Sequence, residues 1–92
     1  MFNHSDYKMV REDTLDTLDN WAKHCWPPGS FCQAVLENNL KEAFGRADMK
    51  NRNALFDICR YVYNELPSGC QGSPANTRAW KPLPDEIINA WK

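Results

Sequence analysis

Residues 48–66 read DMKNRNALFDICRYVYNEL, and this stretch decides the fold. At about 100° per residue on a helical wheel, its apolar side chains form one broad stripe. The stripe consists of Leu55, Phe56, Ile58, Cys59, Val62, Tyr63 and Leu66. Asp48 is the predicted N-cap, because its short carboxylate can accept the free N–H groups of a first helical turn. Pro67 ends the helix, since the residue before a proline is driven out of the helical conformation. The stretch therefore predicts a central amphipathic helix.

The remaining chain predicts shorter helices arranged around this central one. Apolar residues at helical spacing fall in four further segments and a final turn or two, at about 10–25, from Gly29 onward, 40–47, 74–80 and 85–92. Whether the second and third segments form one bent helix or two stays open. Residues 1–8 are expected to be loosely ordered, and residues 81–84 form a proline-rich connection. The prediction is an all-α, compact single domain over residues 1–92, with five or six short helices around residues 48–66.

Composition excludes several classes of protein. Hydrophobic residues make up 42% and charged residues 25% of the chain, which is typical of a globular domain. The net charge is −1, and no segment carries the basic excess by which proteins bind nucleic acid. No apolar run approaches the roughly 18 residues that a membrane-spanning helix needs. The first residues lack the pattern of a secretory signal, so a cytoplasmic location is expected.

The four cysteines are candidates for metal binding or nucleophilic chemistry. Their spacing matches no zinc motif of paired cysteine ligands. His24 and Cys25 together with Cys32 can supply three ligands, and His24 can serve Cys32 or Cys70 as a base. Neither arrangement has an orienting third group, and packed, reduced thiols explain the pattern more simply. We therefore predict no catalytic residue, no metal and no cofactor, and a thiol- or metal-dependent enzyme is the second alternative.

Carboxylates repeat at helical spacing near the N-terminus. Asp13, Asp16 and Asp19 lie three residues apart and can hold a hard cation on one face of a helix. A solvated acidic face is the favoured interpretation, with Asp19 facing water. A helix-turn-helix can also be drawn through residues 29–47, but its lysine and arginine are matched by two glutamates. A nucleic-acid-binding regulator is therefore the first alternative function.

Surface residues suited to protein binding are the main functional prediction. Arg46 is at the centre of a polar patch and can make bidentate contacts, although helix capping is the favoured explanation of the patch. Tyr61 lies off the apolar stripe beside Arg60, a combination common in interfaces. Packing of Tyr61 under the C-terminal segment explains its position equally well. Trp91 belongs to a C-terminal segment that either covers the core or contacts a partner. The predicted interface is Arg46, Arg60, Tyr61 and Trp91, and a homodimer is possible.

One longer pattern resembles a known group of proteins. It reads PGxFxxAVLxNxLxEA from Pro28, RADxxN from Arg46 and YNxxPxGCxGSP from Tyr63, followed by Trp80. This pattern is similar to an uncharacterised family of small proteins encoded by prophages and other bacterial mobile elements. The chain departs from it at Asn39 and Gln71 and at the pair Cys25-Trp26. The resemblance implies an accessory protein in the host cell that binds a host or phage protein, such as a defence or DNA-metabolism complex, and inhibits or redirects it.

Overall fold

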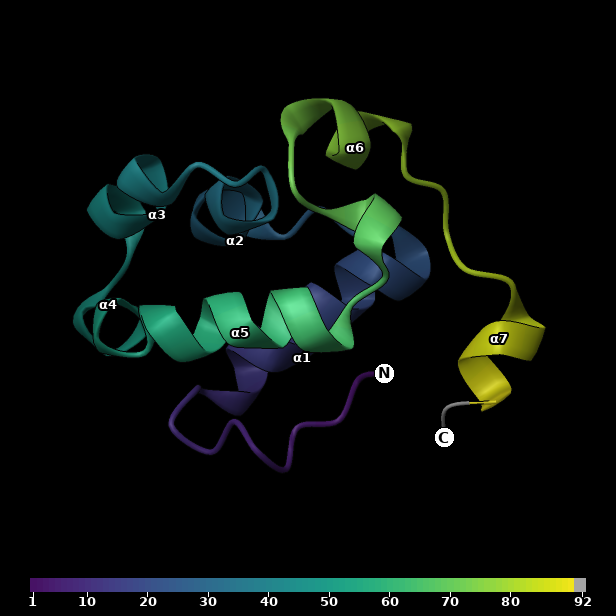
Figure 1. Cartoon of the computed structure of the whole chain (residues 1–92), viewed down its shortest axis with the longest axis horizontal. Coiled ribbons are helices and arrows are strands. Elements are labelled where there is room, and N and C mark those ends of the chain that lie inside the picture. The colour runs from purple at the N-terminus through teal and green to yellow at the C-terminus, as the bar shows by residue number, and fades with distance from the viewer. Residues whose placement is uncertain (91–92) are drawn as a thin grey trace.

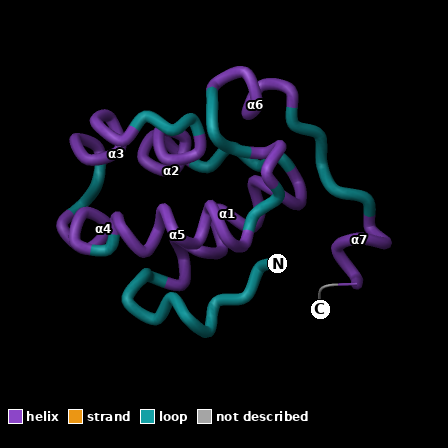
Figure 2. The backbone as a smooth tube through the Cα atoms, viewed as in Figure 1, coloured by secondary structure: helices purple, strands orange, loops and turns teal. Residues whose placement is uncertain are grey.

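The computed structural model describes residues 1–90, and in this range every regular element is helical. The α-helices are α1 (Glu12–His24), α2 (Gly29–Leu36), α3 (Leu40–Arg46), α4 (Met49–Asn53), α5 (Leu55–Glu65), α6 (Pro74–Ala79) and α7 (Asp85–Ala90), with a short 3₁₀ helix η1 (Ser68–Cys70). The prediction of an all-α single-domain bundle is confirmed (Figures 1 and 2). None of the described helices is both long and apolar enough to cross a membrane.

The stretch 48–66 forms two helices rather than the single one predicted. Asp48 caps α4 as expected, because its Oδ1 accepts the Asn51 backbone N–H at 2.8 Å. Ala54, with a ψ of 8°, then departs from helical geometry and separates α4 from α5. Figure 1 shows the two helices running in different directions on either side of it. α5 ends at Glu65, and Leu66 before Pro67 is extended, as the proline requires.

The core lies between α1, α2 and α5. Its completely covered side chains are Leu15 and Leu18 of α1, Leu36 of α2, Ile58 and Tyr61 of α5, and Cys70 of η1. The predicted stripe on α5 is therefore partly wrong, because Phe56 and Tyr63 are 77% and 81% exposed while Tyr61 is buried. Apolar residues occupy most of the circumference of α5, so the stripe alone does not fix which side faces inward.

The N-terminal segment selects the buried side of α5. Residues 1–8 were expected to be loose, but the Phe2 N–H donates to the Glu65 carbonyl at 3.1 Å. The Tyr7 ring packs edge-on against Tyr61, with 5.0 Å between the ring centroids, and Val10 is also in the core. The segment therefore packs beside α5 (Figure 1), and its aromatic contact turns the Tyr61 side of the helix inward.

Two separate helices follow α1. Asn38 has a positive φ of 63°, which ends α2, and the Asn39 side chain caps α3 by accepting the Glu42 N–H at 3.3 Å. Only Ala43 of α3 is buried, while Leu40 and Phe44 are about half exposed. Leu40 instead lines a groove beside α5.

The chain after α5 is held to α1 by two tryptophans. The Trp21 indole N–H donates to the Cys70 carbonyl and the Trp80 indole N–H donates to the Ala22 carbonyl, each at 2.9 Å. Ser73 caps α6 by accepting the Asn76 N–H at 3.1 Å, and Pro74 is at the first helical position, as predicted. The proline-rich connection then leads to α7, which has no buried residue and lies apart from the other helices (Figure 1). The described part of the C-terminal segment therefore does not cover α5.

Candidate functional site

The residues predicted to form an interface do not lie together. Arg46 on α3 is exposed, and it pairs with Glu42 at 3.0 Å. Arg60 on α5 is half exposed and pairs with Asp57 at 2.9 Å. Tyr61 is completely buried, so its prediction as a contact residue is wrong. Its ring fills the core against the N-terminal segment. Trp91 lies outside the described residues.

A groove of about 510 Å³ runs along the outer side of α5. Its first wall comes from the end of α2 and the start of α3, its second from α5, and its third from the loop after η1. The lining residues are Val35, Asn38, Leu40, Phe56, Cys59, Arg60, Val62, Tyr63, Asn64, Gln71 and Gly72. Arg60 is the one predicted interface residue among them.

Two aromatic side chains dominate this groove. Phe56 and Tyr63 are seven residues apart, which places them two turns apart on one face of α5. Both are more than three-quarters exposed, and Leu40, 49% exposed, stands on the opposite wall. Isolated exposed apolar residues are ordinary, but several that line one hollow form a contiguous apolar surface. The sequence contains part of this signal, because Phe56 and Tyr63 are apolar residues seven positions apart, but the same spacing also suits a core position, which is what the predicted stripe gave them.

Polar groups at the groove are mostly uncharged. Asn38, Asn64 and Gln71 contribute amide groups, and the Arg60 guanidinium is engaged by Asp57 and lies 5.0 Å from the centre of the Tyr7 ring. The Gly72 N–H donates to the Leu36 carbonyl at 2.7 Å, which ties the third wall to α2. The groove is therefore an apolar hollow with amides at its edges and with walls that are fixed to one another.

The thiols have the properties of packed side chains rather than of nucleophiles. All four cysteines are free, and Cys32 and Cys70 are buried. Burial raises the pKa of Cys32 to about 11 and that of Cys70 to about 12, so both stay protonated near neutral pH. Burial also raises the pKa of Cys59, which lines the groove. The alternative ligand set of His24, Cys25 and Cys32 is not among the groups of metal-ligating side chains that residues 1–90 bring together.

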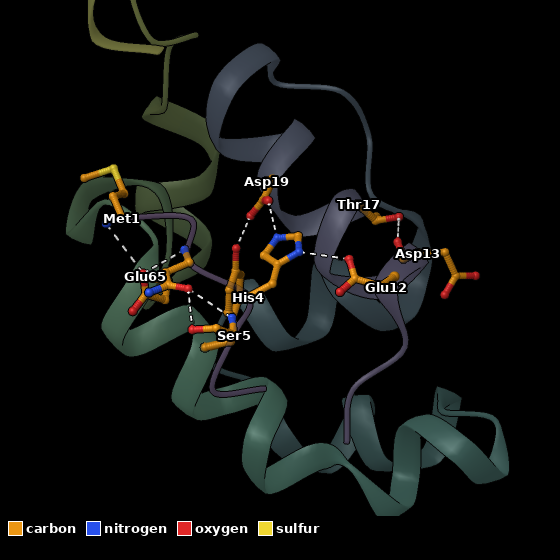
Figure 3. Close-up of polar contacts among 10 residues, drawn as sticks. Met1, His4, Ser5, Glu12, Asp13, Thr17, Asp19 and Glu65 are labelled. Atoms are coloured by element: carbon orange, nitrogen blue, oxygen red, sulfur yellow. Dashed lines mark hydrogen bonds and ion pairs between the residues drawn. The ribbon is translucent and has the colours of Figure 1, made fainter. Parts of the chain in front are cut away.

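Apart from the groove, a polar cluster that the sequence did not predict joins the N-terminal segment to α1. The imidazole of His4 lies between two carboxylates, with Nδ1 2.9 Å from Glu12 Oε2 and Nε2 2.7 Å from Asp19 Oδ2 (Figure 3). The Tyr61 hydroxyl donates to the other oxygen of Asp19. The prediction that Asp19 faces water is wrong, since its side chain is only 8% exposed. Leu15, Leu18, Asp19 and Ala22 follow the i, i+3, i+4, i+7 spacing of one helix face, which was the available signal.

The titration of this cluster follows from burial and its hydrogen bonds. Burial alone lowers the pKa of His4, but the hydrogen bonds to Asp19 and Glu12 outweigh it and raise that pKa above 6.5. Burial raises the pKa of Asp19 more than the hydrogen bonds from Tyr61 and His4 lower it. Burial and the bond to Asp19 raise the pKa of Tyr61 so far that its hydroxyl is always a donor. In this cluster the buried Asp19 carboxylate therefore accepts hydrogen bonds from the His4 imidazole and the Tyr61 hydroxyl.

No protein-family model, curated protein or solved structure matches this chain.

Proposed function

We propose that this protein is a small non-enzymatic binding module that docks an amphipathic segment of a partner protein in the groove beside α5. One observation supports the proposal above all. Phe56 and Tyr63 stand on one face of α5, lining the groove, and no other described element covers them. Exposing two large aromatic side chains is unfavourable in water, and covering them is the main source of affinity in protein interfaces.

The shape of the groove favours a protein segment over a small molecule. Small-molecule sites enclose most of their ligand, whereas Phe56 and Tyr63 project outward from an open hollow. A helix with apolar residues at i, i+3 or i+4 and i+7 fits such a surface, with its anchors between the aromatic pair and Leu40. The amides of Asn38, Asn64 and Gln71 can then bond polar groups at the edge of the helix.

The source of the partner is proposed from the resemblance to mobile-element proteins. That resemblance implies a host or phage protein in the cytoplasm of a bacterium, and binding would inhibit or redirect it. The net charge of −1 and the absence of free cationic groups among those lining the groove favour a protein partner over a nucleic acid.

A comparison of matched surface variants tests the proposal. The double variant Phe56→Ser, Tyr63→Ser removes the aromatic pair, and Met9→Ser removes an equally exposed side chain elsewhere (73% exposed). Each immobilised chain is exposed to a bacterial lysate, and retained proteins are quantified by mass spectrometry. The partner is then purified and titrated by calorimetry. We expect the Met9 variant to match the original chain and the double variant to bind at least about 30-fold more weakly, as loss of a hot spot implies.

Two results would overturn this function. One is that every retained protein binds the double variant as well as the original chain. The other is that the purified protein is a dimer of twice 10.7 kDa by light scattering and that the double variant is a monomer. In that case a second copy of this chain fills the groove, and no foreign partner is needed to explain it.

A further inference from the structure

The cluster at His4 contains a second, independent feature. His4, Asp16 and Asp19 each present a metal-ligating atom, and the three atoms lie within 4.8 Å of one another. His4 comes from the N-terminal segment, and the two aspartates lie one turn apart on α1. The imidazole and the Asp19 carboxylate point toward one another in Figure 3. The fold therefore brings together donors that are separated by up to 15 positions in the chain.

Hydrogen bonds with neighbouring groups orient His4 and Asp19. His4 Nδ1 is 2.9 Å from Glu12 and donates its proton there, so Nε2, which faces Asp19 and Asp16, is the nitrogen that can exchange its proton for a metal. Metal-bound histidines in proteins are commonly fixed by a carboxylate in this manner. The far oxygen of Asp19 is held by the Tyr61 hydroxyl, which leaves Oδ2 directed at His4. Asp16 takes part in none of the hydrogen bonds or ion pairs among residues 1–90, so its carboxylate is available.

We propose that His4 Nε2 and the carboxylates of Asp16 and Asp19 form a binding site for a divalent transition metal such as Zn²⁺. One imidazole nitrogen with two carboxylate oxygens is a donor set that suits zinc and disfavours magnesium and calcium, which prefer oxygen ligands alone. Metal–ligand bonds of about 2.1 Å place tetrahedral donors about 3.4 Å apart. The 2.7 Å separation of Nε2 and Oδ2 must therefore open slightly as the metal replaces the proton between them.

This site differs from the acidic triplet read from the sequence. Asp13 is the third carboxylate of that triplet, but it is 2.6 Å from the Arg11 guanidinium and is not part of the cluster. His4 takes its place and brings the N-terminal segment with it. The metal therefore joins that segment to α1, and its binding stabilises the folded chain without involving the groove beside α5.

Two variants of the same helix test the site on the full chain. Asp16→Asn removes a ligand that makes no other polar contact, so the metal-free protein is expected to unfold as the original does. Asp13→Asn is the matched control one turn earlier. The chains are treated with a chelator and titrated with Zn²⁺ by calorimetry and by thermal unfolding. We expect Zn²⁺ to raise the melting temperature of the original chain and the Asp13 variant, with at least tenfold weaker binding by the Asp16 variant.

Cobalt distinguishes this site from adventitious binding to the thiols. Co²⁺ bound at His4 and the aspartates gives visible absorption without the near-ultraviolet charge-transfer band of a cobalt–thiolate bond. Binding is also expected to release a proton, because the metal displaces the one shared by His4 and Asp19. The proposal is wrong if Zn²⁺ leaves the melting temperature unchanged, if the Asp16 variant binds as tightly as the original chain, or if the thiolate band accompanies binding.

Discussion

Replacing Tyr61 with phenylalanine isolates the hydrogen bond at the centre of the fold. The ring keeps its edge contacts with Tyr7 and His4, at centroid distances of 5.0 and 5.5 Å, so only the hydroxyl is lost. That hydroxyl donates to the Asp19 carboxylate, which is only 8% exposed and so has little access to water as a replacement donor. Losing a hydrogen bond to a buried charged group destabilises a protein by about 1.5–3 kcal/mol. For a chain of this size the melting temperature should fall by about 4–8 °C for each of these kcal/mol.

Chemical and thermal unfolding in the presence of a chelator measure this loss. Tyr63→Phe is the matched control, because Tyr63 is 81% exposed on the opposite face of α5 and should change stability by less than about 0.5 kcal/mol. Asp19→Asn completes a double-mutant cycle, and the two changes should be clearly non-additive because they share one bond. If Tyr61→Phe unfolds within about 0.5 kcal/mol of the original chain, Tyr61 is not the buried donor described here.

Three other changes test local features of the fold. Gly72→Ala should destabilise the chain by about 1–2 kcal/mol in urea unfolding, because Gly72 has a φ of 103°, which an alanine adopts only with strain. Gly45→Ala is the control and should be neutral or slightly stabilising, because Gly45 lies in α3 with open space around it. Ser73→Ala should cost about 1 kcal/mol by loss of the α6 cap, and an unchanged urea midpoint would contradict that role. Thiol labelling of the native chain at about pH 8 should leave Cys32 and Cys70 unmodified, since burial raises their pKa values to about 11 and about 12; rapid labelling of all four cysteines would refute this.

The sequence predicted those features that depend on neighbouring residues. Asp48 and Ser73 cap helices because a short polar side chain reaches N–H groups two or three residues away. Pro67 ends α5 for an equally local reason. Such interactions need no knowledge of the rest of the fold. The class of fold and most helix positions could therefore be obtained from residue spacing alone.

The orientation of α5 could not be obtained in this way. Its apolar residues surround most of the helix, so the same pattern is compatible with burying Phe56 and Tyr63 or with burying Tyr61. The choice is made by residues more than fifty positions earlier, where the Tyr7 ring packs on Tyr61. The polar appearance of residues 1–8 concealed that contact. A prediction from local spacing does not include this long-range contact, so it cannot decide which face of α5 is buried.

The buried face of α5 and the proposed binding face are consequences of the same rotation. The Tyr61 side faces inward because His4, Tyr7 and Asp19 supply an aromatic and hydrogen-bonding environment that suits a tyrosine. Phe56 and Tyr63 lie on the face of α5 opposite Tyr61, so when the Tyr61 face packs inward these two side chains point to solvent. Without the packed N-terminal segment, α5 could bury Phe56 and Tyr63 in the core, and Tyr61 would then be exposed. The His4 cluster thus stabilises the exposed aromatic surface from the opposite side of α5, although it touches neither Phe56 nor Tyr63.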